Sequence, residues 1–238
     1  MLVEMYGFTR DHPAIQQAAE FFFSRQTDEG DIRGIIGNQY MPYYMGVIMA
    51  RLIRAGYGDD PRIEAGFAWL IGFRQDDGGW AGSLRTLGLS YEEALACGSL
   101  QPDRTKPHQH LMTGMVLRAF AAHPVYRQHP AAIQAADLMK ARLFQRDRYA
   151  DRQAVTYWTR FQYPLWWPTL ITVLDCLAEM GDTCINPQVA RALDWFVQHQ
   201  GADGLWPTGY GSGGKAAVAI PWIGLAICRA LKAFYPDE

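Results

Sequence analysis

Residues 61–80, which read PRIEAGFAWLIGFRQDDGGW, decide the fold. Apolar side chains recur at helical spacing in this stretch, at Ile63, Phe67 and Leu70, so the sequence predicts an amphipathic helix. Pro61 fits the first helical position, because the N–H that proline lacks has no helical partner there and its φ angle is already helical. A glutamine, two aspartates and two glycines then lead to Trp80, a combination that predicts a tight polar turn.

This unit occurs four times along the chain. Each copy starts with a polar residue and a proline and runs as an amphipathic helix to a glutamine, over residues 13–26, 61–75, 130–145 and 187–200. A second, more apolar helix is expected after each copy, at about residues 41–55, 108–122, 165–180 and 217–234. Internal repetition of this kind predicts a repeat architecture of helical hairpins, with boundaries near residues 11–56, 59–123, 128–181 and 185–235.

The second helices are apolar on nearly all sides, so other elements must cover both of their faces. Two concentric layers satisfy this requirement, with the second helices inside and the first helices outside. The sequence therefore predicts an all-α protein that forms one domain over residues 1–238. The expected architecture is an α/α toroid of about four helical hairpins, with inner and outer helix layers.

The second and fourth turns resemble the QW motif of the prenyltransferase and squalene oxidase repeat, which squalene and oxidosqualene cyclases and protein prenyltransferase β subunits carry. The residues that carry the resemblance are Trp69-Leu70-Ile71 with Gln75, Gly79 and Trp80, and Trp195-Phe196-Val197 with Gln200, Gly204 and Trp206. The resemblance implies that Gln75, Trp80, Gln200 and Trp206 are structural residues that tie adjacent outer helices together. Members of this family close larger rings, so four hairpins imply an incomplete ring.

The composition excludes several classes of protein. The 238 residues are 49% apolar and only 19% charged, with a net charge of −2, which rules out intrinsic disorder. No basic excess or Lys/Arg run is present to neutralise phosphates, so nucleic acid is not an expected partner. The uncharged stretches 161–174 and 216–228 are too short to span a membrane, and no signal-like segment opens the sequence. We therefore expect no transmembrane segment and a cytoplasmic location.

Long loops lead from the first helices to the second helices, for instance over residues 80–107 and 145–164. Loops of this length are usually functional, and they surround helix N-termini, where the helix dipole favours an anion. The predicted substrate-binding residues lie in these loops or at the helix starts; they are Tyr43, Tyr44, Trp158, Trp166, Trp167, Tyr210 and Lys215. Such aromatic rings either stabilise a carbocation through their π faces or pack the core.

Candidate catalytic residues follow from the resemblance and from position. The cyclases resembled here use a protonated aspartate in a DxDD sequence, which this chain lacks. Asp175, halfway along a second helix, would serve as the acid if burial raised its pKa, and the alternative is a structural aspartate. Asp103 and His110, which lie in or beside the longest loop, are the other two catalytic candidates.

Zinc is the one cofactor that the resemblance suggests. The protein prenyltransferases resembled here hold zinc with an aspartate, a cysteine and a histidine, and zinc needs three or four converging ligands. Cys97, His108 and His110 are the candidate ligands in this chain. The alternative is a helix-capping histidine and a buried thiol.

The leading hypothesis is a terpenoid cyclase-like or prenyltransferase-like protein that binds a long apolar isoprenoid in a central cavity lined by aromatic rings. One alternative is a non-catalytic binding or scaffold toroid that lacks the acid. Another is a carbohydrate-active α/α-barrel enzyme, although no motif pairs its available carboxylates, Glu92, Glu93, Asp103 and Asp151. The expected partner is an apolar small molecule, while contact with a membrane surface and self-association stay open.

Overall fold

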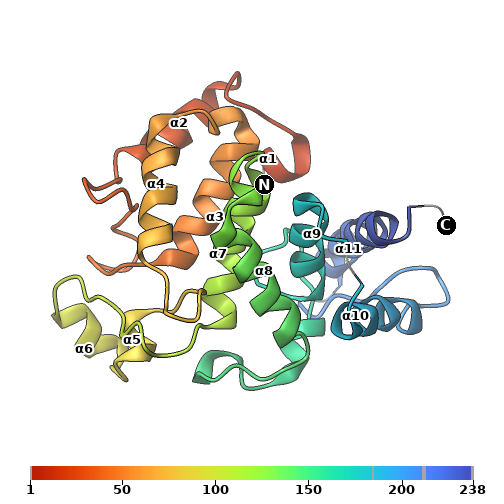
Figure 1. Cartoon of the computed structure of the whole chain (residues 1–238). Coiled ribbons are helices and arrows are strands. Elements are labelled where there is room, and N and C mark those ends of the chain that lie inside the picture. Colours follow the sequence, from red (N-terminus) through yellow and green to blue (C-terminus); the bar gives the residue numbers. More distant parts are fainter. Residues whose placement is uncertain (1, 184, 211–212, 237–238) are drawn as a thin grey trace. The chain divides into compact units, whose positions relative to one another are not determined.

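The computed structural model describes residues 2–183, 185–210 and 213–236. Every regular element in these ranges is helical, apart from an isolated bridge between Gln26 and Ile32. The predicted all-α class is therefore confirmed, as Figure 1 shows, whereas the toroid stays a prediction. The chain divides into two compact units, Met1–Ala135 (unit 1) and Ala136–Glu238 (unit 2), where the sequence predicts a single domain.

The first helix of each repeat begins at its predicted proline. These helices are α2 (Pro13–Phe23), α4 (Pro61–Gly72), α8 (Pro130–Arg142) and α10 (Pro187–Gln198). The side chain before each proline accepts the backbone N–H two residues ahead: His12 at 3.2 Å, Asp60 at 2.9 Å, His129 at 3.1 Å and Asn186 at 3.0 Å. Proline has no N–H to donate, so the N–H of the residue after it is the first that the capping side chain can accept.

The second helices lie close to their predicted positions. They are α3 (Pro42–Leu52), α7 (His110–Ala122), α9 (Leu170–Met180) and α11 (Gly214–Phe234). Helix α9 begins later than predicted because Pro168 disfavours a helical conformation at the residue before it, and Thr169 becomes the N-cap. Helix α11 begins earlier than predicted, at Gly214.

Short helical segments fill much of the remaining chain. They are α1 (Leu2–Tyr6), α5 (Ser83–Thr86), α6 (Tyr91–Ala96), a π-helical turn (Ile53–Tyr57) and 3₁₀ turns at Tyr126–Gln128, Ala150–Arg152 and Val155–Thr159. The two long loops therefore contain local structure of their own.

In unit 1, helix α3 packs against both α4 and α7, and the three run side by side in Figure 1. Two glycines permit the close approach. A Cβ atom on Gly46 of α3 would lie 2.5 Å from the carbonyl oxygen of Met115 in α7. A Cβ atom on Gly66 of α4 would lie 2.6 Å from the Cε atom of Met45 in α3. A larger side chain at Gly46 would meet the α7 backbone and push the helices apart, whereas one at Gly66 would displace the ends of Met45 and Met49.

The tryptophan of each clear QW turn joins the first helix of its repeat to the second. In unit 1, Trp80 Nε1 donates to the carbonyl of Leu70 in α4 at 2.8 Å, and its ring lies 5.7 Å from that of Phe120 in α7. In unit 2, Trp206 Nε1 donates to the carbonyl of Phe196 in α10 at 2.7 Å. The Trp206 ring also lies against Gly224 of α11. Both tryptophans are almost completely buried.

The motif glutamines make different contacts from one repeat to the next. Gln200 Nε2 donates to Gly204 within its own turn, and Gln75 Nε2 donates to the carbonyls of Asp103 and Lys106 in the long loop. Among the motif glutamines of the described residues, Gln26 of the weakly matching first copy links adjacent first helices, since its Nε2 donates to the carbonyl of Arg62 in α4 at 2.8 Å. The motif residues thus make structural contacts, but mainly within their own repeats.

Candidate functional site

Asp77, in the turn after α4, holds His108, which lies just before α7. The Oδ2 atom of Asp77 lies 2.8 Å from Nδ1 of His108 and accepts the His108 backbone N–H at 2.9 Å. A carboxylate only accepts hydrogen bonds, so Nδ1 of His108 carries a proton and donates it to Asp77. Partial burial raises the pKa of Asp77, but hydrogen bonds from His108 and Gly79 outweigh it and lower the pKa to about 2.

The turn is fastened to the start of α7 by further hydrogen bonds. The backbone N–H of Gln109 donates to the carbonyl of Trp80 at 2.8 Å, and the N–H of Trp80 donates to Thr113 Oγ1 at 3.0 Å. A Cβ atom on Gly79 would lie only 2.5 Å from the Cβ atom of His108, so this position needs a glycine. These contacts fix the direction of the His108 ring.

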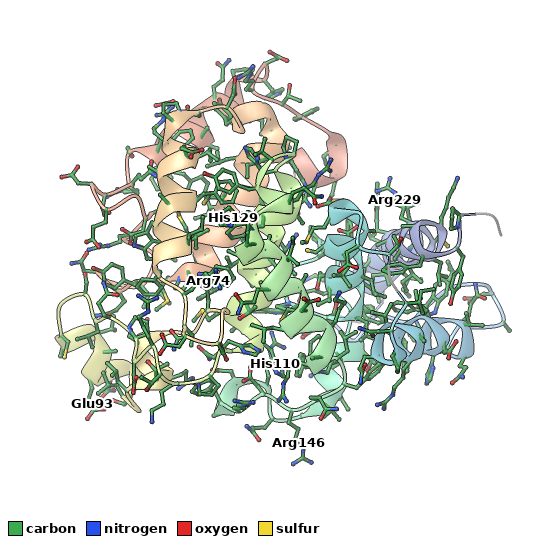
Figure 2. All side chains as sticks on the ribbon, viewed as in Figure 1. Arg74, Glu93, His110, His129, Arg146 and Arg229 are labelled. Carbon is green, nitrogen blue, oxygen red and sulfur yellow. The ribbon has the colours of Figure 1, made fainter. Side chains whose placement is uncertain are left out.

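The other ring nitrogen of His108 is buried and has no hydrogen-bond partner among the described residues. The ring of His110, which is also buried, lies 6.0 Å from that of His108 between centroids. Figure 2 labels His110 at the start of α7. A neutral imidazole with a free lone pair can accept a proton or bind a metal. Because this atom is covered, a ligand reaches it only if neighbouring side chains move.

The three candidate zinc ligands are not brought together. Cys97 is exposed at the end of α6, whereas His108 and His110 are buried at the start of α7. Within the part of the chain that the structure describes, no three His, Cys, Asp or Glu side chains form a group that could hold a metal ion. The carboxylate that contacts His108 belongs to Asp77, a residue of the QW turn that is not among the candidate zinc ligands.

The two candidate catalytic aspartates lie in different units. Asp103, in unit 1, accepts hydrogen bonds from the backbone N–H and the hydroxyl of Thr105 at 3.0 and 2.6 Å, and these bonds lower its pKa. A lowered pKa keeps the Asp103 carboxylate charged and makes it a poor general acid. Asp175, in unit 2, is half-buried in the middle of α9.

Two aromatic pairs lie in unit 2, and three of their four residues come from the segment that precedes α9. Tyr163 stacks on Trp222 of α11, with ring centroids 5.3 Å apart and planes at 8°. Trp166 and Trp167 meet edge to face at 6.1 Å. All four side chains are half-buried, and we call them the α9 aromatic cluster. The guanidinium of Arg152 lies 5.2 Å from the Trp167 ring, which places a cation beside the cluster.

The other predicted substrate-binding residues differ in their surroundings. Trp158 is fully buried and its Nε1 donates to the carbonyl of Gln145 at 2.9 Å, which is the position of a core side chain. Tyr210 is half-buried beneath the guanidinium of Arg160, and Lys215 is exposed in the first turn of α11. In unit 1, Tyr43 and Tyr44 are half-buried in the first turn of α3, with ring centroids 4.1 Å apart.

Two contributors are missing from the residues predicted for the site. The sequence places Asp77 in the turn alone, and its partner His108 lies 31 positions away, so sequence spacing gives no signal for the pair. Trp222 lies in the middle of α11 and not at a helix start. The sequence signal for it is that Trp222 and Phe234 are the two aromatic residues of this helix.

Comparison with known proteins does not identify a family. No protein-family model matches this sequence, and a search of curated proteins also finds no match.

Proposed function

We propose that the protein is a terpenoid cyclase-like or prenyltransferase-like protein that binds a long apolar isoprenoid. In this proposal the α9 aromatic cluster contacts the hydrocarbon chain of the substrate. In this proposal the protein acts in the cytoplasm and needs no bound metal to hold the hydrocarbon chain of the isoprenoid.

The half-burial of the α9 aromatic cluster is the observation that carries the proposal. Trp80, Trp158 and Trp206 are at most 2% exposed, so this chain covers its structural tryptophans thoroughly. Trp166, Trp167 and Trp222 keep part of their surface uncovered. An isoprenoid chain laid against these rings would gain about 0.8 kcal/mol for each CH₂ group that it buries. Their π faces would also attract a cationic intermediate by about 0.5–2 kcal/mol each.

Arg152 supports an isoprenoid with an anionic head. Its guanidinium lies 4.9 Å from the Tyr157 ring and 5.2 Å from the Trp167 ring, so two aromatic faces orient it at the edge of the cluster. A planar guanidinium pairs well with phosphate oxygens. An isoprenoid diphosphate therefore matches the cluster better than an uncharged isoprenoid does.

The residue proposed to supply the acid in a cyclisation is Asp175 of α9. The missing DxDD sequence favours a second candidate function, in which the protein binds the isoprenoid without converting it. The two functions share the binding site and differ only in turnover.

Incubation of the purified protein with isoprenoids from farnesyl diphosphate to squalene, followed by native mass spectrometry and product analysis, tests the proposal. We expect a bound isoprenoid, and products that disappear in Asp175→Asn if the protein is a cyclase. Binding without products would assign the non-catalytic function. The absence of any bound isoprenoid would overturn the proposal.

A further inference from the structure

Helix α11 is apolar on two opposite faces, and its own unit covers only one of them. The covered face includes Ile223, Ile227 and Phe234, and α11 packs against α9. An 18-residue window of the helix has a mean hydropathy of 1.6, yet only 28% of that window is buried. A helix that is apolar all round is normally covered all round, so something outside unit 2 should cover the second face.

The uncovered face is a continuous stripe. Its apolar members are Val218, Pro221, Leu225 and Cys228, which follow each other at intervals of three and four residues and therefore share one side of the helix. Val218 is 65% exposed and Leu225 is 41% exposed. We call these four residues the α11 outer stripe.

The charged residues of α11 are all cations, and they lie near the two ends of the helix. Lys215 lies in the first turn, and Arg229 and Lys232 lie near the C-terminal end; all three are exposed. Figure 2 labels Arg229 on the side of α11 that faces away from α10. The outer stripe is therefore an apolar strip with positive charge at both ends.

We propose that the α11 outer stripe binds the surface of a membrane that contains anionic lipids. Its apolar side chains enter the boundary between headgroups and acyl chains, and its cations contact lipid phosphates. The helix lies along the surface and does not span the bilayer, because its opposite face is buried in unit 2. Among the described helices, α11 alone is long and apolar enough to cross a membrane, and its packing against α9 favours a helix that lies along the surface.

Charge disfavours a second copy of the chain as the cover. In a two-fold dimer the same surface meets itself, so two outer stripes would pack together. An antiparallel pair would bring Arg229 and Lys232 of each copy toward Lys215 of the other, and a parallel pair would bring each cation toward its own counterpart. Like charges repel in both cases, whereas lipid phosphates attract all three cations. This inference does not depend on isoprenoid binding.

Flotation of the full chain with lipid vesicles tests the proposal. We expect binding to vesicles that contain phosphatidylglycerol, weaker binding to pure phosphatidylcholine, and a decrease as salt is added. Val218→Glu should weaken binding to the anionic vesicles about tenfold or more, because it removes a valine from the lipid and adds an anion. Val197→Glu is the matched control, since Val197 of α10 is equally exposed at 65%.

A charge variant keeps the test decisive if Val218→Glu does not fold. Lys232→Gln should weaken binding about fivefold, the effect of one cation near an anionic surface. Failure of the wild-type chain to bind anionic vesicles would overturn the proposal, as would an equal loss in Val197→Glu. A lipid-free dimer that Val218→Glu converts to monomers would also overturn it, because a second copy would then cover the stripe.

Discussion

The tryptophans of the QW turns and those of the α9 aromatic cluster are the same kind of side chain in two different states. Trp80 and Trp206 are buried, and each indole N–H donates to the carbonyl of a first helix. Trp166 and Trp167 lie in the chain that approaches α9 and are half-buried. The first pair is explained by the hydrogen bonds and packing of the fold. The second pair keeps apolar surface that the fold does not use, which is why we place ligand binding there.

Replacement of a turn tryptophan should have the largest effect on stability. Trp206→Ala removes a buried ring between α10 and α11 and leaves the carbonyl of Phe196 without its donor, so we expect a loss of about 3–5 kcal/mol in the free energy of unfolding. Urea denaturation followed by circular dichroism measures it. Trp167→Ala is the control from the other group and should lose much less. Equal losses would erase the distinction between the two groups.

The Asp77–His108 pair should have an intermediate and pH-dependent effect. Hydrogen bonding lowers the pKa of Asp77 from 3.8 to about 2, so the carboxylate stabilises the fold above its unfolded pKa and this contribution is lost as the pH falls toward 2. About a third of the Asp77 side chain is exposed, so we discount the full shift for solvent screening. We expect Asp77→Asn to lose about 1–2 kcal/mol at neutral pH, and the difference from wild type to shrink below about pH 4.

Urea titrations at several pH values check this expectation. Asp76→Asn makes the same change at the neighbouring aspartate, whose side chain is 64% exposed, and should stay within about 0.5 kcal/mol of wild type. A difference between wild type and Asp77→Asn that is constant down to about pH 2 would show that the carboxylate charge is not what holds His108.

The α9 aromatic cluster should show the smallest effect on stability. Trp167→Leu keeps an apolar side chain at a half-buried site. It does not break an indole hydrogen bond of the kind that Trp80 and Trp206 make. We expect a change within about 1 kcal/mol in the free energy of unfolding, measured by the same urea titration. A loss as large as that of Trp206→Ala would assign Trp167 to the core.

The sequence predicts the helices well because their signals are local. A polar residue followed by proline marks the start of α2, α4, α8 and α10. The structure shows the reason, since the polar side chain accepts a backbone N–H of the first helical turn. Apolar periodicity locates the second helices in the same way. The late start of α9 could have been predicted as well, since Pro168 restricts the residue before it.

Features that depend on distant contacts were not predictable. The pairing of Asp77 with His108 joins a turn to a helix start after a long loop, and no local pattern encodes it. The same limit applies to Trp158, whose aromatic character fits a binding loop equally well until its burial and its bond to Gln145 are known. The division into two units falls inside α8, where the helical pattern continues without interruption.

Isothermal titration with farnesyl diphosphate tests the central claim most directly, in wild type and in a variant that carries both Trp166→Leu and Trp167→Leu. The account predicts binding by wild type and about tenfold or more weaker binding by the double variant, with little change in unfolding free energy. Trp195→Leu, at a half-buried tryptophan of α10 that stacks on His199, is the matched control and should bind like wild type. Equal affinity in wild type and the double variant would contradict the claim that the α9 aromatic cluster holds the ligand.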